Sequence, residues 1–308
     1  MNNAAWREEL VSIGADVAFD EPLGPKVSFR IGGPADAFVK VKSADQLAAV
    51  LALADRRQIP VLVLGGGTNV LIGDGGVRGI VLRMAGALAS VELSSPVDGV
   101  GRATIGAGAL NAAVVAQALD LGLVGLEFLG TIPGTFGGAL IMNAGAHGGE
   151  IAPFVEEVEL VDAERRVVWR PGHACGFAYR HSGFAAGEIL TRAILSAKQG
   201  DAAQAREHLA KMREARRKTQ PIGEPNAGSI FKNPPGDYAG RLIEAAGLKG
   251  TRVGAARISE LHANFIVNAG GARAREVVEL AELAQARVKE KFSVELEWEV
   301  KRLGDFGV

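Results

Sequence analysis

The sequence has little cysteine and no long apolar run, and both absences narrow the class of protein. Cys175 is the single cysteine among 308 residues, which excludes an internal disulfide framework and suits a reducing compartment. No stretch reaches the roughly 18 uninterrupted apolar residues of a membrane-spanning helix. The first residues include Glu8, Glu9 and Asp16 instead of an apolar signal segment. We therefore expect a cytoplasmic protein without a membrane partner.

Net charge and metal-ligand spacing are also lacking. The formal net charge is −1, so no broad electrostatic attraction to nucleic acid or anionic lipid is expected. The five histidines show no ligand spacing such as His-Glu-x-x-His, and Cys175 has no partner, so we expect no metal site. With 48% hydrophobic and 22% charged residues, the chain is a globular protein with an ordinary core. Its length predicts two or three domains, and we expect a monomer.

Hydrophobic spacing predicts alternating strands and helices, which is typical of an α/β or α+β fold without a fixed-period repeat. Ser43 is expected to cap a helix over 44–57. Further helices are expected over 110–121, 207–218 and 274–291. Strands are expected over 37–41, 59–64, 79–84, 90–93, 103–105, 155–162, 166–170 and 294–302. A shift in composition at Asp201, followed by Pro221 and Pro225, predicts a domain boundary near residue 200.

Glycine is abundant, at 41 residues, and it clusters. The strand expected over 59–64 runs into Gly65, Gly66, Gly67, Thr68 and Asn69. Without Cβ atoms, backbone N–H groups there can approach a phosphate closely. The alternative is a tight turn between two strands, and the absence of a following Gly-Lys-Ser/Thr excludes a P-loop.

A second glycine cluster covers 130–148. It contains Gly130, Ile132, Pro133 and Gly134, followed by Asn143 and Gly145. Many glycines beside Thr and Asn donors suit a backbone-lined groove for a pyrophosphate or a ring edge. So long an irregular loop is itself an indication of function.

Three shorter segments carry polar chemistry. Ser229, Lys232 and Asn233 lie within five residues of one another, and Arg180 follows Tyr179. Near the C-terminus, strand periodicity places Glu295, Glu297 and Glu299 on one face. Each segment taken alone also fits an ordinary solvated surface.

Taken in order, these segments resemble the UDP-N-acetylenolpyruvoylglucosamine reductase family. The resemblance covers nearly the whole chain, through 28–36, 65–69, 130–148, 179–182, 228–234, 259–268 and the Glu-rich tail. The short connection after Arg180 is similar to the subclass that lacks an extra tyrosine-bearing loop. His147 stands where many members have an aromatic such as tyrosine, and Thr68 replaces a common serine.

The resemblance implies an α+β fold. It consists of an FAD-binding module of the vanillyl-alcohol-oxidase (PCMH) type in two subdomains, followed by a C-terminal α/β substrate-binding domain. We expect the first subdomain over 1–57, joined by a C-terminal strand within 294–308. The second subdomain is expected over 58–200 and the substrate-binding domain over 201–293.

The resemblance also implies the reaction. NADPH would reduce FAD, and hydride would pass to the enolpyruvyl group of UDP-N-acetylglucosamine-enolpyruvate, giving UDP-N-acetylmuramate for peptidoglycan synthesis. Arg180 would stabilise the enolate-like charge. Glu299 would hydrogen-bond the same region, with Glu297 as the alternative carboxylate. Ser229 would donate the proton that completes saturation.

The binding residues follow from the same resemblance. Lys232, Asn233 and Asn264 would contact the UDP-sugar substrate. The residues expected to contact FAD are Arg30, Gly65, Gly66, Gly67, Thr68, Asn69, Gly130, Ile132, Pro133, Gly134, Asn143 and Gly145.

Two other functions are compatible with the glycine segments. The first is an FAD-dependent sugar or alcohol oxidase of the same superfamily, with His147 as a possible point of covalent flavin attachment. The segment 228–234 and the acidic tail argue against it. The second is a nucleotide-binding regulatory module without chemistry, which predicts loss of Arg180, Ser229 and Glu299, although all three are present.

Overall fold

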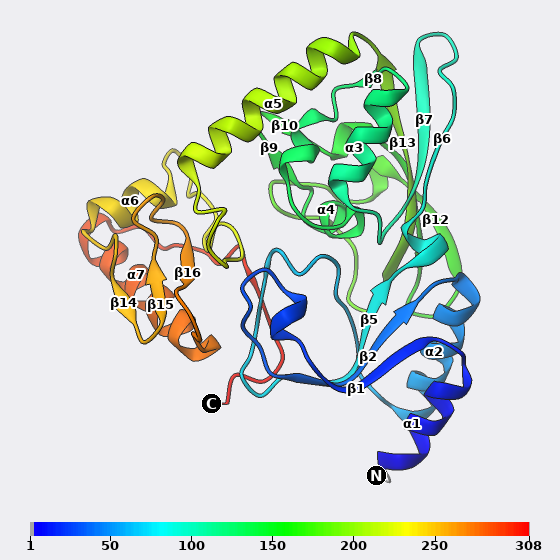
Figure 1. Ribbon diagram of the computed structural model, residues 1–308, viewed down its shortest axis with the longest axis horizontal. Coiled ribbons are helices and arrows are strands. Elements are labelled where there is room, and N and C mark those ends of the chain that lie inside the picture. The colour runs from blue at the N-terminus through cyan, green and yellow to red at the C-terminus, as the bar shows by residue number, and fades with distance from the viewer. Residues whose placement is uncertain (1–2, 308) are drawn as a thin grey trace. The chain divides into compact units, whose positions relative to one another are not determined.

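The computed structural model describes residues 3–307, and their contacts divide the chain into two compact units (Figure 1). Unit 1 holds the described residues up to Ala18, with Ala37–Gly66 and Ile80–Glu214. Unit 2 holds Phe19–Asp36, Gly67–Gly79 and the described residues from Ala215 onward. The boundaries expected after residues 57 and 200 do not coincide with these units, and the three-domain division stays a prediction.

A four-stranded sheet has the order β1-β2-β5-β3 (Figure 1). Its strands are β1 (Asp16–Pro22), β2 (Pro34–Val41), β3 (Val61–Val63) and β5 (Val77–Met84), and β3 runs parallel to β5. In unit 1, helix α1 (Asn3–Ser12) contacts α2 (Ala44–Arg57). The Ser43 hydroxyl accepts a hydrogen bond from the Gln46 N–H, so the predicted cap and helix are confirmed. The strand predicted over 59–64 is shorter than expected, since only Val61–Val63 is regular, and Val63 is exposed.

Unit 1 also contains a six-stranded antiparallel sheet. Its order is β12-β11-β13-β7-β6, and β8 also pairs with β13. The strands are β6 (Val91–Leu93), β7 (Val100–Gly106), β8 (Leu123–Val124), β11 (Val155–Val161), β12 (Val167–Pro171) and β13 (Ile189–Gln199). Helix α3 (Asn111–Asp120) contacts β6 and β8, and α4 (Phe136–Ile141) contacts β7 and β13.

Sequence periodicity missed two features of unit 1. Strand β13 pairs with three other strands, yet no strand was expected there. The segment 126–149, expected to be irregular, contains short helices and a small hairpin. These are the 3-10 turn η3 (Glu127–Thr131), α4, β9 (Gly145–Ala146) and β10 (Gly149–Glu150). Tertiary contacts support α4 in spite of its glycines, because the N–H groups of Phe136 and Gly137 donate to the carbonyls of Ala109 and Ala107.

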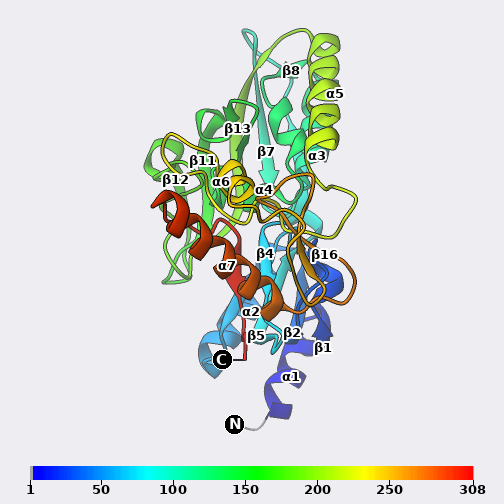
Figure 2. The same ribbon diagram turned by 90° about the vertical axis from the view of Figure 1, so that its left-hand side faces the viewer.

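Unit 2 has a three-stranded antiparallel sheet of β14 (Arg252–Val253), β15 (Ala256–Ile258) and β16 (Ile266–Asn268). Helix α7 (Ala274–Phe292), seen along its length in Figure 2, contacts β14, β15 and α6 (Ala239–Ala245). Phe29, Ile31 and Leu71 belong to the same buried cluster as the faces of α6 and α7. This shared core explains why 19–36 and 67–79 group with the C-terminal residues. Helix α5 (Ala202–Thr219), which includes the helix predicted over 207–218, runs through the boundary of the units at Glu214.

The strand predicted over 294–302 is wrong over most of its length. Only β17 (Lys301–Leu303) is a regular strand there, and it pairs in parallel with β4 (Val70–Ile72). Before it, Trp298 forms an isolated antiparallel bridge with Phe231. Burial nevertheless alternates along this segment, because Leu296 and Val300 are buried while Glu295 and Glu297 are exposed.

The shorter 3-10 turns complete the chain. They are η1 (Gly24–Lys26), η2 (Gly86–Ala89), η4 (Ala152–Phe154) and η5 (Gly172–Ala174).

Candidate active site

In unit 1, the two predicted glycine segments pack closely against each other. A Cβ placed on Gly65 would lie 2.4 Å from the Thr135 hydroxyl oxygen, and one on Gly66 would lie 2.6 Å from the Gly134 Cα. A side chain at Gly66 would therefore force the two segments apart, because the atoms it meets are backbone. The Asn111 side chain holds the second segment, since its amide nitrogen donates to the Ile132 carbonyl at 3.1 Å.

In unit 2, the remainder of the first segment packs on residues 26–28. Gly67 has a φ of +65°, and a Cβ on it would lie 2.8 Å from Val27. Its carbonyl accepts a hydrogen bond from the Ser28 N–H at 2.9 Å. Two residues further on, Arg30 has a φ of +55°, and its exposed guanidinium has no ion pair among the residues that the structure describes.

These segments fit the cofactor that the sequence predicts. Within unit 1, the N–H groups of Gly65 and Gly66 donate no backbone hydrogen bond among the described residues. Successive unpaired N–H groups form a concave site that favours an anion such as a phosphate. The Asn111 oxygen is buried and has no partner within the described chain, so it can accept from a polar ring N–H.

Arg180 lies at the tip of a tight turn that the glycine cluster supports. The N–H of His181 and that of Ala178 each donate to the other's carbonyl at 3.0 Å, and Arg180 takes a φ of +53°. The Arg180 guanidinium donates to the Gly145 carbonyl at 2.9 Å and lies 5.1 Å from the centre of the Tyr179 ring. The predicted catalytic arginine and a predicted cofactor residue are therefore direct neighbours.

Asn143 is buried beneath the same turn, with 1% of its surface exposed. Its amide nitrogen donates to the Ala178 carbonyl and to the Glu150 carboxylate, both at 3.1 Å. Its oxygen accepts from the Ala152 N–H at 3.1 Å. All three hydrogen bonds are made to other groups of the chain. They join the Arg180 turn to β10 and to Ala152, which follows β10.

Ser229 belongs to a segment of unit 2 that is held on both sides. The Asn264 side chain accepts from the Phe231 N–H at 3.0 Å and donates to the Phe231 carbonyl at 2.8 Å. The Asn264 carbonyl also accepts from the Ile230 N–H at 2.8 Å. On the other side, the Glu299 N–H donates to the Ile230 carbonyl at 2.8 Å. The structure thus brings together three segments that are far apart in the sequence.

The three carboxylates of the acidic tail differ from one another in their surroundings. Glu295 pairs with Lys289 at 2.6 Å, and Glu297 pairs with Lys232 at 3.3 Å. The side chain of Glu297 is 75% exposed, whereas Glu299 is half-buried. Asn69, expected to bind cofactor, donates through its side chain to the Glu299 carbonyl at 3.2 Å.

The remaining predicted residues occupy simpler positions. Asn233 is exposed, and its side chain accepts a hydrogen bond from the Ala239 N–H at the start of α6, at 3.1 Å. The Gly130 carbonyl accepts from Arg213 of α5 at 3.2 Å. His147 is exposed in the turn between β9 and β10, with a φ of +52°.

Sequence reasoning missed Asn226, whose side chain holds the turn that leads into the Ser229 segment. Its side-chain nitrogen donates to the carbonyls of Pro221 and Glu224 at 3.0 and 2.7 Å, and its oxygen accepts from the Gly228 N–H at 2.9 Å. An Asn two residues before a glycine is a common turn signal, and Gly228 has a φ of +80°. That signal could have identified the residue.

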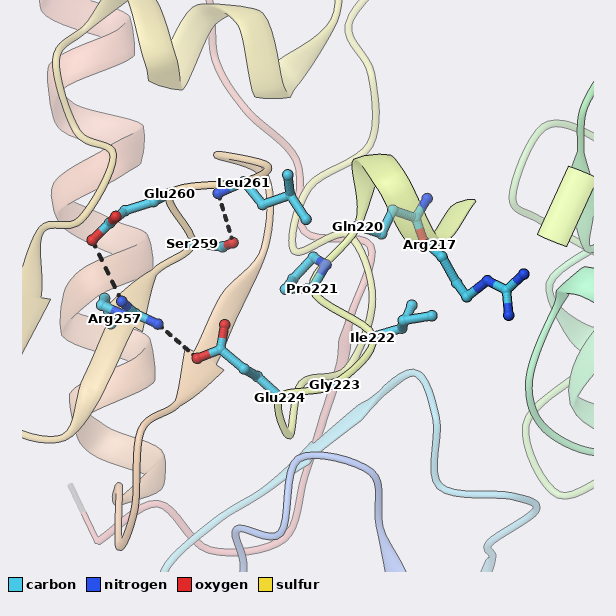
Figure 3. Close-up of a pocket in the computed structure, with 10 residues that line it drawn as sticks. All are labelled: Arg217, Gln220, Pro221, Ile222, Gly223, Glu224, Arg257, Ser259, Glu260 and Leu261. Carbon is cyan, nitrogen blue, oxygen red and sulfur yellow. Dashed lines mark hydrogen bonds and ion pairs between the residues drawn. The ribbon is translucent and has the colours of Figure 1, made fainter. Parts of the chain in front are cut away.

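A pocket of about 430 Å³ lies within unit 2 beside this turn (Figure 3). The Arg257 guanidinium reaches Glu224 at 2.6 Å and Glu260 at 3.4 Å, while its Nε is buried without a partner in the described part of the chain. Ile222 and Leu261, both about half exposed, supply apolar surface at the pocket. It is lined by Arg217, Gln220, Pro221, Ile222, Gly223, Glu224, Arg257, Ser259, Glu260 and Leu261.

His262 adjoins the Asn264 segment and has an altered proton affinity. Its ring packs edge-on against Phe265 at 4.9 Å between centres, and its Nδ1 accepts from the Asn264 N–H at 3.3 Å. Burial lowers the pKa of the His262 imidazole, and the nearby charge of Lys249 lowers it further. Both effects disfavour the charged ring in the folded protein.

Comparisons with known proteins match both parts of the chain to described domains. Residues 35–169 match the model of an FAD binding domain, and residues 220–303 match that of the C-terminal domain of UDP-N-acetylenolpyruvoylglucosamine reductase. A reductase of that name from Anaeromyxobacter sp. (strain Fw109-5) is 44% identical over 99% of this chain and 94% of its own length. One from Myxococcus xanthus is 46% identical over 95% of this chain and 94% of its own length.

A solved structure gives the same result for the fold. The chain is similar to the crystal structure of UDP-N-acetylenolpyruvylglucosamine reductase from Thermus caldophilus, with a TM-score of 0.80 and 36% identity. The match covers 94% of this chain and 98% of that one. The predicted α+β architecture, an FAD-binding module followed by a C-terminal domain, is confirmed. The chain belongs to the UDP-N-acetylenolpyruvoylglucosamine reductase family.

Proposed function

We propose that the protein is an FAD-containing, NADPH-dependent reductase that converts the enolpyruvyl group of UDP-N-acetylglucosamine-enolpyruvate to a lactyl ether. The product is UDP-N-acetylmuramate, a precursor of peptidoglycan. The observation that carries the proposal is the three-segment arrangement in unit 2. It holds Ile230, directly after Ser229, between Asn264 and the Glu299 backbone.

Held by the glycine segments of unit 1, FAD would supply the chemistry of hydride transfer between NADPH and the substrate double bond. The residues of the chain then stabilise the negative charge that develops on the substrate and supply the proton that its carbon takes up. Arg180 stabilises the negative charge that develops beside the substrate carboxylate, as a fixed cation does at low cost in reorganisation. Its hydrogen bond to Gly145 supports this role, because a guanidinium that is already held loses little freedom during the reaction.

Ser229 donates its hydroxyl proton to the carbon that carries the enolate charge, and the alkoxide regains a proton from solvent. The product thus gains one hydride and one proton across the former double bond. A serine hydroxyl is a weak acid, so positioning must supply much of the effect. The hydrogen bonds of Asn226 and Asn264 on either side of Ser229 support that requirement.

Glu299 is the proposed carboxylate partner, in preference to Glu297. Glu297 forms an exposed ion pair with Lys232. Glu299 is half-buried, and its backbone is hydrogen-bonded to Ile230 and Asn69. This arrangement favours Glu299 as the group that hydrogen-bonds the reacting region.

Lys232 and Asn233 are proposed to bind the anionic and hydroxylated parts of the UDP-sugar. The pocket beside the Asn226 turn suits the nucleotide end (Figure 3). Ile222 and Leu261 offer apolar surface to a flat ring, and the Arg257 guanidinium is part of the pocket lining.

Turnover of purified protein tests the function. The purified protein should be yellow. It should oxidise NADPH when the enolpyruvyl sugar nucleotide is added and should do so only slowly without that substrate. Rapid oxygen-driven turnover without that substrate would instead support the sugar or alcohol oxidase. Protein that binds no flavin would contradict both functions.

We further propose that the protein acts as a cytoplasmic monomer and binds neither nucleic acid nor membrane. No helix within residues 3–307 is both long and apolar enough to cross a bilayer. Light scattering of the purified holoenzyme measures the oligomeric state, and a mass near twice 32.0 kDa would contradict the monomer.

A further inference from the structure

The Asn143 side chain donates a hydrogen bond to the backbone of the Arg180 turn. Its amide donates to the Ala178 carbonyl, and the Ala178–His181 pair of backbone hydrogen bonds closes the turn whose tip is Arg180. The remaining hydrogen bonds of the Asn143 side chain go to Glu150 and Ala152. Because the residue is 1% exposed and its amide group is engaged at both ends, its described contacts are structural.

The guanidinium of Arg180 is held by the same stretch of chain. Gly145, two residues after Asn143, accepts from the Arg180 side chain at 2.9 Å. A Cβ on Gly145 would lie 2.7 Å from the Gly149 carbonyl and 3.4 Å from the Arg180 guanidinium. The segment 143–145 thus fixes Arg180 at two places, through the turn backbone and through the charged end.

Both residues also adopt an uncommon backbone conformation. Asn143 has a φ of +39° and Arg180 one of +53°. Asparagine tolerates that region better than most residues, whereas arginine there must be held by its surroundings. The Asn143 hydrogen bond to Ala178 is one of the interactions that hold it.

From these contacts we infer that Asn143 is a positioning residue for Arg180, and that it acts through the Ala178–His181 turn instead of through direct contact with FAD. The inference rests on the proposed function, in which Arg180 stabilises charge during substrate reduction. Asn143 then influences substrate reduction and leaves reduction of bound FAD by NADPH nearly unchanged.

Two substitutions and one control test the inference in full-length, FAD-loaded protein. Asn143→Asp keeps an acceptor for the Ala152 N–H but loses the donor to Ala178. Asn143→Gly removes the side chain and suits the positive φ. Glu150→Ala removes the exposed partner of Asn143 and leaves the Ala178 bond in place. Stopped-flow absorbance of the flavin separates reduction by NADPH from reoxidation by substrate.

Both Asn143 variants should slow reoxidation by substrate roughly 10- to 100-fold, the scale of a misplaced catalytic group. Their rate of reduction by NADPH should stay within about twofold, and Glu150→Ala should change neither rate by more than that. Hydrogen exchange of the 177–182 peptide should be faster in Asn143→Asp than in the unsubstituted protein or in Glu150→Ala. An unchanged exchange rate in that peptide would overturn the inference.

A double-substitution cycle separates failure of the inference from failure of the proposed function. If Asn143 acts through Arg180, Asn143→Asp should add less than about twofold in an Arg180→Ala background. A full additional effect there overturns the positioning role and leaves the role of Arg180 standing. If Arg180→Ala itself reoxidises at the normal rate, the proposed role of Arg180 and the inference both fail.

Discussion

The side-chain amide of Asn69 donates a hydrogen bond to the backbone carbonyl of Glu299, with 3.2 Å between nitrogen and oxygen. The two residues are 230 positions apart, and the Lys301 N–H returns a bond to the Asn69 carbonyl at 3.0 Å. Asn69 ends the glycine segment, and Glu299 is the proposed catalytic carboxylate. One residue therefore connects the predicted cofactor segment to the acidic tail within unit 2.

We expect Asn69→Ala to loosen the Glu299 backbone without separating β4 from β17. The variant loses one side-chain hydrogen bond, worth about 1 kcal/mol in the free energy of unfolding, while the Lys301 bond to the Asn69 backbone remains. Hydrogen exchange should rise in the 295–300 peptide and stay unchanged in 301–303. Equal exchange in both peptides, with unchanged turnover, would show that the Asn69 contact does not position Glu299.

Glu299→Gln and Glu297→Gln form a matched pair that tests which carboxylate takes part in catalysis. Glu299→Gln should slow substrate reduction at least roughly 10-fold, toward the 10²–10⁴-fold range of general acid–base groups. Glu297→Gln breaks an exposed ion pair, an interaction worth about 0–1 kcal/mol, so its kcat should fall less than about threefold. The reverse order of the two effects would identify Glu297 as the catalytic carboxylate.

Ser229→Ala should separate the two half-reactions. Loss of the hydroxyl removes the proton donor for the substrate carbon, so flavin reoxidation by substrate should slow by roughly 10²–10⁴-fold. Reduction of the flavin by NADPH needs no proton from Ser229 and should be nearly unchanged. Rapid-mixing absorbance measures both rates on the same sample, and an equal fall in both would refute the proton-donor role.

Asn264→Leu tests whether this asparagine holds the Ser229 segment or contacts substrate. Leucine leaves the N–H and carbonyl of Phe231, a residue that is 1% exposed, without their side-chain partner. Two unsatisfied buried groups should lower the free energy of unfolding by about 2–4 kcal/mol.

The control for this prediction is Asn233→Ala, which removes an exposed acceptor at the start of α6 and should cost about 1 kcal/mol. Urea unfolding measures both values. A stable Asn264→Leu protein with a raised substrate KM would instead support the direct contact that the sequence predicts.

The sequence predicts local features well and long-range partners poorly. Helix α2 and its Ser43 cap follow from side chains within four residues of one another, and both were predicted. Asn143 and Asn264 were identified as site residues, but nothing local indicates that their amides bond to Ala178 and Phe231. These partners lie 35 and 33 positions away and are set by the fold.

The same reason explains the errors in secondary structure. The tail over 294–302 alternates in burial, yet its pairing with 230–232 is limited to the isolated Phe231–Trp298 bridge, so regular strand geometry begins only at Lys301. Strand β13 is stabilised by pairing with β11 and β7. Alternation along one segment predicts which side chains are buried, whereas regular strand geometry depends on partners elsewhere in the chain.

His262 should make stability depend on pH below neutrality. Its pKa in the folded protein lies below the ordinary value of 6.5, chiefly because burial disfavours the charged ring. The unfolded chain therefore binds the proton more readily than the folded protein. The contribution of His262 to stability is complete above pH 6.5 and is lost as the pH falls from there through the folded pKa.

His262→Phe keeps an aromatic ring against Phe265 and removes the titration. The loss of unfolding free energy between pH 7.5 and pH 5 should be smaller in this variant than in the unsubstituted protein. Urea unfolding at the two pH values measures it, with His173→Gln, a change at an exposed histidine, as the control that should keep the original pH dependence. If His262→Phe and His173→Gln show the same pH dependence, His262 is not the titrating group.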